Sequence, residues 1–183
     1  MNNDFDVVVI GAGPGGYVCA IRSAQLGLKT ACVEASETLG GTCLNVGCIP
    51  SKSLLYSSEM YHKTQKEFNN LGIEIASLKL NLSKMMNNKK KSILTLTKGV
   101  EFLFKKNKIF HLKGTGLILD KNKVVVIDDS KKKVTYSTKN IIIATGSVPT
   151  SLPNIKIDEK IIVSSTGALT FDKPPKDLVV IGG

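Results

Sequence analysis

A glycine-rich turn between a strand and a helix constrains the fold of this chain more than any other feature. Residues Phe5–Ile10 (FDVVVI) are almost all apolar or β-branched, which predicts a buried strand. The pattern G-x-G-x-x-G follows at residues 11–16, and a helix is predicted from about residue 15 to residue 26, with Gly27 placed to end it. Lys29–Glu34 (KTACVE) predicts a second strand, which completes a β-α-β unit of about thirty residues.

Each of the three glycines in this pattern is required for a different physical reason. Gly11 permits the tight turn out of the strand, Gly13 lets the backbone approach a pyrophosphate, and Gly16 allows close packing of helix on strand. The helix N-terminus offers N–H groups and partial positive charge to phosphates. Glu34 ends the second strand, where a carboxylate suits the hydroxyls of an unphosphorylated ribose, as in FAD or NAD. The pattern therefore predicts dinucleotide binding in a Rossmann-like α/β domain, and the alternative is a purely structural turn.

The chain has four cysteines, and two of them stand apart. Cys19 falls in the predicted helix and Cys32 in the second strand, and both are interpreted as small buried hydrophobic residues. Cys43 and Cys48 lie five positions apart in the string GGTCLNVGCIPSK, residues 40–52.

An ideal helix would hold Cys43 and Cys48 apart. Residues five apart are rotated by roughly 140° and separated by about 7.5 Å of rise, whereas a disulfide needs Cα atoms within about 7 Å. Gly47 and Pro50 can supply the distortion that brings the thiols together. A bridge closing so short a loop stabilises little and is a redox element more often than a staple. The alternative is two reduced thiols; a metal site is not expected, because four suitably spaced ligands are absent.

Two helices are predicted as an insertion after the second strand, over Ser51–Asn70 and Leu82–Lys106. The apolar positions of the second helix are predicted to form one packed face. These positions are Met85, Met86, Ile93, Leu94, Leu96, Val100, Leu103 and Phe104.

Short strands dominate the rest of the chain. The spacing of the first four predicts an antiparallel β-meander, the next is a buried strand, the stretch 150–175 is loop-like, and an apolar strand begins near the end. The predicted strands are Lys108–Lys113, Gly116–Leu119, Val124–Asp128, Lys133–Ser137, Asn140–Ala144 and Val179–Ile181.

The formal charge of +10 on 183 residues raises the question of nucleic-acid binding. The charge is almost all lysine, in clusters such as Lys89–Lys91 and Lys131–Lys133, and no aromatic residues interleave these clusters as stacking platforms. We therefore expect no specific nucleic-acid partner. No apolar run approaches the roughly 18 residues of a membrane span, and neither a secretory signal nor an Arg-rich presequence is visible.

The string GGTCLNVGCIPSK resembles the redox-disulfide segment of the class I pyridine nucleotide–disulfide oxidoreductases, and within them it looks most like that of the dihydrolipoamide dehydrogenases. Glutathione reductases usually have valine at the position of Ile49 and lysine at that of Ser51, and mercuric reductases usually have valine at those of Leu44 and Ile49. The segments GAGPGGYVCAIRSAQLGLKTACVE and SSTGAL (164–169) also resemble that family, so the resemblance covers nearly the whole chain.

The resemblance implies a set of FAD-binding residues. The glycine turn would hold the pyrophosphate, Glu34 the adenosine ribose, the turn around Gly116 the adenine, and Lys52 the isoalloxazine near N5; a solvated helix lysine is the alternative for Lys52. The full set is Gly11, Gly13, Pro14, Gly15, Gly16, Glu34, Ala35, Gly40, Gly41, Thr42, Cys43, Lys52, Thr115, Gly116, Ala144, Thr145, Gly146 and Ser147.

The resemblance also implies a mechanism. Reduced lipoamide would reduce a Cys43–Cys48 disulfide, with Cys43 as the interchange thiol and Cys48 against the flavin, and electrons would pass through FAD to NAD. The family draws its base from a His–Glu pair in a C-terminal interface domain of the partner subunit. Neither His62 nor His111 has that context, so we assign neither a role.

The expected organisation is an FAD-binding domain over residues 1–149, followed by a connector and the first strand of an NAD-binding Rossmann unit over 150–183, where LVVIGG echoes VVVIGAG. We expect this chain alone to be incomplete as an enzyme. The resemblance implies a homodimer that acts on the lipoyl domain of a 2-oxoacid dehydrogenase complex, in the mitochondrial matrix or alternatively in a plastid or the bacterial cytoplasm. The competing interpretations are a glutathione- or mercuric-type reductase and a non-catalytic FAD-binding module.

Overall fold

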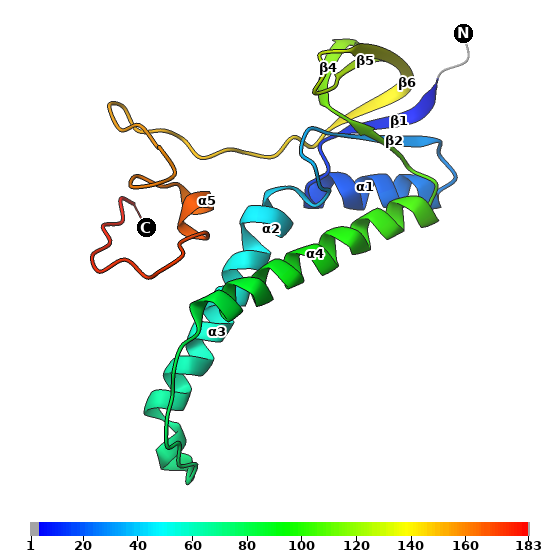
Figure 1. Cartoon of the computed structure of the whole chain (residues 1–183). Coiled ribbons are helices and arrows are strands. Elements are labelled where there is room, and N and C mark those ends of the chain that lie inside the picture. Colours follow the sequence, from blue (N-terminus) through cyan, green and yellow to red (C-terminus); the bar gives the residue numbers. More distant parts are fainter. Residues whose placement is uncertain (1–3, 183) are drawn as a thin grey trace. The chain divides into compact units, whose positions relative to one another are not determined.

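The computed structural model describes residues 4–182, which form two compact units. The first unit contains residues 4–45 and 93–148, and the second contains residues 46–92 and 149–182. The elements, coloured along the chain in Figure 1, are β1 (Phe5–Ile10), α1 (Pro14–Gln25), β2 (Thr30–Glu34), α2 (Gly41–Val46), α3 (Cys48–Lys66), a 3₁₀ turn (Phe68–Leu71), α4 (Leu82–Lys106), β3 (Phe110–Lys113), β4 (Thr115–Asp120), β5 (Lys123–Ile127), β6 (Lys133–Ile143) and α5 (Ser165–Ala168).

The sheet of the first unit runs in the order β3-β2-β1-β6-β5-β4. β3, β2, β1 and the second half of β6 are parallel, and β4, β5 and the first half of β6 are antiparallel. Figure 1 shows α1 lying along one face of the parallel part. Val8 and Val9 of β1 are fully buried, as expected of a central parallel strand covered on both faces. The predicted α/β fold with a parallel sheet, helical insertion and meander is confirmed.

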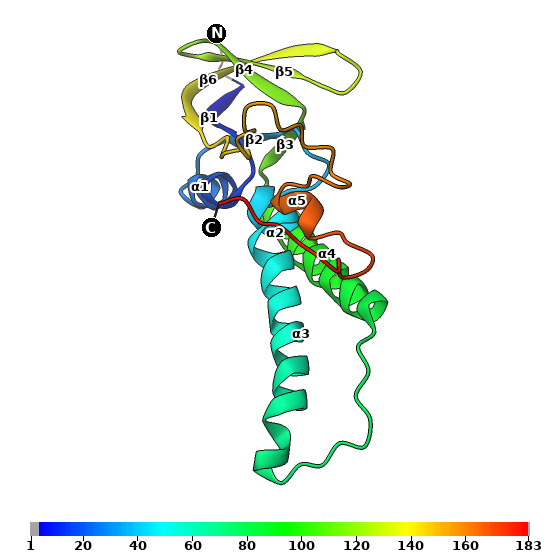
Figure 2. The same ribbon diagram turned by 90° about the vertical axis from the view of Figure 1, so that its left-hand side faces the viewer.

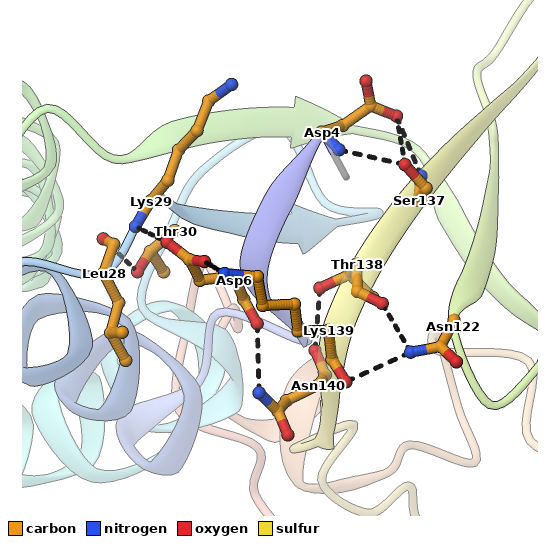
Figure 3. Close-up of polar contacts among 10 residues, drawn as sticks. All are labelled: Asp4, Asp6, Leu28, Lys29, Thr30, Asn122, Ser137, Thr138, Lys139 and Asn140. Atoms are coloured by element: carbon orange, nitrogen blue, oxygen red, sulfur yellow. Dashed lines mark hydrogen bonds and ion pairs between the residues drawn. The ribbon is translucent and has the colours of Figure 1, made fainter. Parts of the chain in front are cut away.

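The strand β6 merges two strands that the sequence predicts separately. Ser137 and Lys123 form the last antiparallel pair with β5, and from Thr138 onward the strand pairs in parallel with β1. Hydrogen bonds with Asn122 hold the junction between the two parts of the strand. The side-chain amide of Asn122 donates to the Thr138 carbonyl at 2.8 Å and to that of Lys139 at 3.2 Å (Figure 3). In return, the Thr138 N–H donates to the Asn122 backbone carbonyl at 2.8 Å.

The first strand of the predicted meander, β3, lies in the parallel part of the sheet instead. β3 pairs in parallel with β2, with Ala31 opposite Phe110 and Glu34 opposite Lys113, so it extends the parallel sheet. Gly114 separates it from the meander, with φ +138°, a conformation in which an added Cβ would lie 2.4 Å from the Ile127 carbonyl oxygen. The meander prediction is therefore right for β4, β5 and β6 and wrong for β3, because the bend at Gly114 redirects the chain.

The helix α4 has the predicted bounds, but its apolar residues do not form one packed face. Thr97, Val100 and Phe104 are buried, whereas Leu94 is 52% and Leu96 42% exposed. Successive helical residues point about 100° apart, so Leu94 and Leu96 flank the buried stripe and do not extend it.

The second unit contains α3, the first part of α4 and α5. Figure 2 shows the extended segment 73–81 that returns from the end of α3 to the start of α4. The predicted strand Val179–Ile181 is wrong for this structure: within residues 4–182 it pairs with no strand, and Val179 is 86% exposed. An isolated strand cannot hydrogen-bond its backbone. None of the helices described between residues 4 and 182 is long and apolar enough to cross a membrane.

Candidate dinucleotide and redox site

The end of β1 is a crowded turn that two glycines make possible. Gly11 has φ +101°, its N–H donates to the Val33 carbonyl at 2.8 Å, and an added Cβ would lie 2.3 Å from the Ala144 carbonyl oxygen. A Cβ on Gly16 would lie 1.8 Å from the Gly11 carbonyl oxygen. The predicted turn role of Gly11 and packing role of Gly16 are confirmed.

The other two glycines of this turn leave open space. Gly13 precedes α1 as its N-cap, and Pro14 is the first helical residue. A Cβ on Gly15 would meet nothing within 4 Å, and one on Gly13 would meet only the Gly41 Cα at 3.9 Å. The helix geometry leaves the N–H groups of Gly15 and Gly16 without an intrahelical carbonyl. The described protein atoms therefore do not need these two glycines for packing, whereas a pyrophosphate seated at the helix N-terminus would.

Glu34 has a structural task in addition to the predicted one. The residue is 8% exposed; its Oε2 accepts the Ala12 N–H and its Oε1 the Ser36 N–H, each at 2.8 Å. The Glu34 side chain thus fixes the backbone of the glycine turn. A carboxylate has about four acceptor positions, so two backbone bonds leave capacity for ribose hydroxyls. Ala35, the next residue, is exposed.

The loop before α2 lies against the same turn. The Gly40 N–H donates to the Ala12 carbonyl at 2.9 Å, and a Cβ on Gly41 would lie 2.5 Å from the Gly13 Cα. Gly40 and Gly41 both have positive φ, +107° and +58°. The structure therefore brings together two glycine motifs that lie almost thirty positions apart in the sequence, and it leaves Thr42 exposed at the start of α2.

The predicted helix distortion near the cysteines occurs at Gly47. α2 ends at Val46, Gly47 has φ −137° and ψ −109°, and α3 begins at Cys48. Pro50 lies in the first turn of α3, where its missing N–H costs nothing. Cys43, on α2, is half-buried, and Cys48 is exposed.

The pairing of Cys43 with Cys48 and the flavin role of Lys52 remain predictions. Cys43 belongs to the first unit and Cys48 to the second, and Lys52 is an exposed residue one helical turn beyond Cys48 on α3.

The other two cysteines differ from each other. Cys32 is fully buried and donates its S–H to the Gly11 carbonyl oxygen at 3.6 Å. Burial, together with the nearby Glu34 carboxylate, raises the pKa of Cys32 to about 12, so this thiol stays protonated at neutral pH. Its interpretation as a buried apolar residue is confirmed, whereas Cys19 is only half-buried.

The remaining predicted site residues follow β3 and β6. Thr115 and Gly116 begin β4 and are not part of a turn, and a Cβ on Gly116 would lie 3.0 Å from Ile10 Cγ2, so its glycine also has a packing reason. The Ala144 N–H donates to the Ile10 carbonyl at 2.8 Å and carries β6 to the glycine turn. The exposed residues Thr145, Gly146 and Ser147 follow at this edge.

The two histidines stay without an assigned role. His111 packs edge-on against the ring of Phe104, with the ring centroids 6.5 Å apart, and desolvation lowers its pKa. His62 lies on α3. Across residues 4–182, no three His, Cys, Asp or Glu side chains gather in a way that could hold a metal ion.

The second unit contains an apolar pocket of about 360 Å³ that the sequence did not indicate. Next to its lining residue Leu169, the buried Lys89 donates a hydrogen bond to the Leu169 carbonyl oxygen, and desolvation lowers the pKa of Lys89. The pocket is lined by Ser51, Leu54, Leu55, Ser58, Leu82, Met85, Met86, Ala168, Leu169, Phe171 and Pro174.

Comparison with known proteins gives consistent relatives. The sequence model of the family described as pyridine nucleotide-disulphide oxidoreductase matches residues 5–183. The chain is 56% identical over 180 residues to the mitochondrial dihydrolipoyl dehydrogenase of Rattus norvegicus, and the match covers 98% of this chain and 35% of the relative. It is 56% identical over 178 residues to the mitochondrial dihydrolipoyl dehydrogenase of Mus musculus, covering 97% and 35%. It is 55% identical over 181 residues to a leghemoglobin reductase of Vigna unguiculata, covering 99% and 35%. The chain thus spans 35% of the length of these relatives.

Proposed function

Because the chain belongs to the pyridine nucleotide-disulphide oxidoreductase family, we propose that it is the FAD-binding part of a flavoprotein disulfide oxidoreductase of the dihydrolipoyl dehydrogenase type. The observation that carries this proposal is the glycine turn at the N-terminus of α1. Gly13 and Gly15 have no side chain although the described protein atoms leave room for one, which is the expected arrangement where a phosphate must approach the backbone.

The residues around this turn fit FAD. The N–H groups at the start of α1 would bind the pyrophosphate, and Glu34 would accept hydrogen bonds from the adenosine ribose, with Ala35 beside it. Gly40, Gly41 and Thr42 would line the flavin side, Thr115 and Gly116 the adenine, and residues 144–147 would close the site. The positive charge of Lys52 would stabilise negative charge on the flavin as it is reduced. When bound, FAD would take two electrons from the reduced cysteine pair and pass them on as hydride, which no protein side chain does.

The two cysteines would carry out thiol–disulfide exchange. A thiolate of dihydrolipoamide would attack Cys43 Sγ of a Cys43–Cys48 disulfide, form a mixed disulfide and release Cys48 as a thiolate. The second substrate thiol, after losing its proton to a base, would attack the substrate sulfur of the mixed disulfide and release Cys43. Lipoamide leaves oxidised, and the cysteine pair holds the two electrons. In this scheme the half-buried Cys43 would be the sulfur that is attacked, and the exposed Cys48 would be the leaving sulfur.

The wider assignments belong to the same proposal. NAD would accept the electrons finally, and residues 150–183 would connect the FAD-binding domain, residues 1–149, to an NAD-binding unit. The natural substrate would be the lipoyl domain of a 2-oxoacid dehydrogenase complex, and the functional enzyme a homodimer. The names of the relatives from Rattus norvegicus and Mus musculus support a mitochondrial location, for which we propose the matrix.

FAD binding tests the proposal most directly. The purified chain should retain FAD through gel filtration. A Gly13→Ala variant should keep its fold, because the new methyl group meets only Gly41 in the protein. It should bind FAD at least tenfold more weakly, a loss of about 1.4 kcal/mol, because the methyl group occupies the space of the proposed pyrophosphate. Wild-type chain that folds but does not retain FAD would contradict the proposal.

Reduction tests the redox part. Dithionite reduction of the FAD-loaded chain should produce a broad long-wavelength absorption band that Cys48→Ser abolishes while FAD stays bound. A non-catalytic flavin-binding module would show no such band. Assays of the full-length protein with lipoamide, glutathione and mercuric ion then separate the three reductase types.

A further inference from the structure

The side chain of Asn45 binds the loop that precedes it at three points. Its Oδ1 accepts the Thr38 hydroxyl at 2.7 Å, and its Nδ2 donates to the Gly41 carbonyl at 2.9 Å and to the Leu39 carbonyl at 3.3 Å. Both N–H groups of the amide and one acceptor position of its oxygen are therefore used. Leu39, at 1% exposed, anchors the same loop in the core.

The loop needs such an anchor because of its composition. Gly40 and Gly41 are consecutive and both have positive φ, and consecutive glycines lose more conformational entropy on ordering than any other pair. This same segment makes the contacts with the glycine turn: the Gly40 N–H bonds the Ala12 carbonyl, and the Gly41 Cα faces Gly13 closely. Asn45 therefore holds the flexible segment at the place where it meets the proposed pyrophosphate site.

We propose that Asn45 is a positioning residue that fixes residues 38–41 against the glycine turn and thereby sets both the affinity for FAD and the accessibility of Cys43. Gly41 is the first residue of α2 and Cys43 lies two positions later, so a displaced loop displaces the thiol as well. Asn45 is not proposed as a catalytic residue, since the three hydrogen bonds described above go to the loop. The inference rests on the proposed FAD-binding function.

The test compares two asparagines that make the same local bond. Asn45 donates to the carbonyl four residues earlier, Gly41, and Asn107 at the end of α4 likewise donates to the Leu103 carbonyl, at 2.8 Å. Asn45→Ala should weaken FAD binding about tenfold, equivalent to about 1.4 kcal/mol, because the loop loses its hydrogen bonds to this side chain. Asn107→Ala should leave the Kd for FAD unchanged whatever it does to the Tm. Thr38→Val, which removes only the Oδ1 contact, should give a smaller effect in the same direction.

A second measurement does not require FAD. In the reduced chain without flavin, peptide mass spectrometry should show that Asn45→Ala raises the iodoacetamide reaction rate of Cys43 severalfold relative to that of Cys48, and that Asn107→Ala does not. Unchanged Kd and unchanged Cys43 rate in folded Asn45→Ala, or equal effects in Asn107→Ala, would overturn the inference. A wild-type chain that binds no FAD would instead refute the proposed function, and the Cys43 rates would still decide the role of Asn45. If Asn45→Ala does not fold, the same two measurements on Thr38→Val decide.

Discussion

At the scale of single residues, the glycine turn combines two kinds of glycine that look alike in sequence. Gly11 and Gly16 are required by neighbouring protein atoms, and Gly13 and Gly15 are not. The Glu34 carboxylate accepts the Ala12 and Ser36 amides, and we propose that its remaining acceptor positions bind the ribose. This distinction lets stability and cofactor binding be separated experimentally.

Gly16→Ala should destabilise the fold, and Gly15→Ala should not. A Cβ at position 16 would lie 1.8 Å from the Gly11 carbonyl oxygen, a backbone atom that cannot move freely, so we expect a loss of about 3 kcal/mol or more. At position 15 the Cβ meets nothing within 4 Å, and alanine should stabilise the helix slightly, by about 0.5 kcal/mol. Urea unfolding of both variants without FAD measures this. Equal free energies of unfolding for the two variants would show that the backbone at Gly11 can move to accept a Cβ at position 16.

At the scale of elements, the junction of the parallel and antiparallel parts depends on one side chain. Asn122, in the turn between β4 and β5, donates to the carbonyls of Thr138 and Lys139 (Figure 3). Thr138 is fully buried, so its carbonyl is not readily hydrated if that donor is lost. The hairpin is further attached where the Ser137 N–H donates to the Asp4 carboxylate at 2.8 Å.

Asn122→Ala should therefore destabilise the first unit by about 1–3 kcal/mol, the cost of leaving a buried acceptor unsatisfied. Amide hydrogen exchange should increase first in β5 and in the first half of β6. Asn107→Ala is the control, because its partner carbonyl lies among exposed atoms and water can replace the lost donor. A loss no larger than that of the control would mean that Thr138 finds another donor.

The elements also show what sequence patterns can and cannot predict here. β1, α1, β2 and α4 were predictable within a residue or two, because each has a local hydrophobic pattern and clear end signals. The pairing of β3 with β2 and the continuity of β6 were not, because both depend on partners distant in the sequence. In the site, Gly11 and Gly16 were predictable from their motif, whereas the Asn45 contacts depend on the folded path of residues 38–41.

At the scale of the whole chain, the surplus of positive charge should make the folded state less stable at acidic pH. The chain has 25 lysines and arginines against 15 acids, so protonating carboxylates increases self-repulsion. Several aspartates have a lowered pKa because the fold stabilises their charged form. For Asp6 the main cause is the bond to Lys139, for Asp120 the Asn122 N–H, for Asp128 the Ser130 hydroxyl and for Asp158 the Lys160 N–H.

Stability should therefore fall below about pH 4. Each lowered pKa means that the folded state binds fewer protons than the unfolded state near the ordinary value of 3.8, so the stabilisation is present above that pH and is lost as the pH falls through the lowered value. Urea midpoints measured from pH 7 to pH 2.5 should show this decline. The midpoint difference between wild type and Asp6→Asn should shrink over the same range; a constant difference would show that the Asp6 charge contributes nothing.

β6 belongs to both the parallel and the antiparallel part of the sheet, and this restricts where related sequences can gain or lose residues. Side chains alternate between the two faces of a strand, so inserting one codon between Ser137 and Thr138 would turn every later side chain of β6 to the opposite face and shift Ala144 away from Gly11 and Gly16. The turn at Asp128–Lys132 has no such restriction, because length added there leaves both ends of β6 in register. Length variation among natural sequences of this type should accordingly collect in the hairpin tips and spare the strand that leads to the cofactor turn.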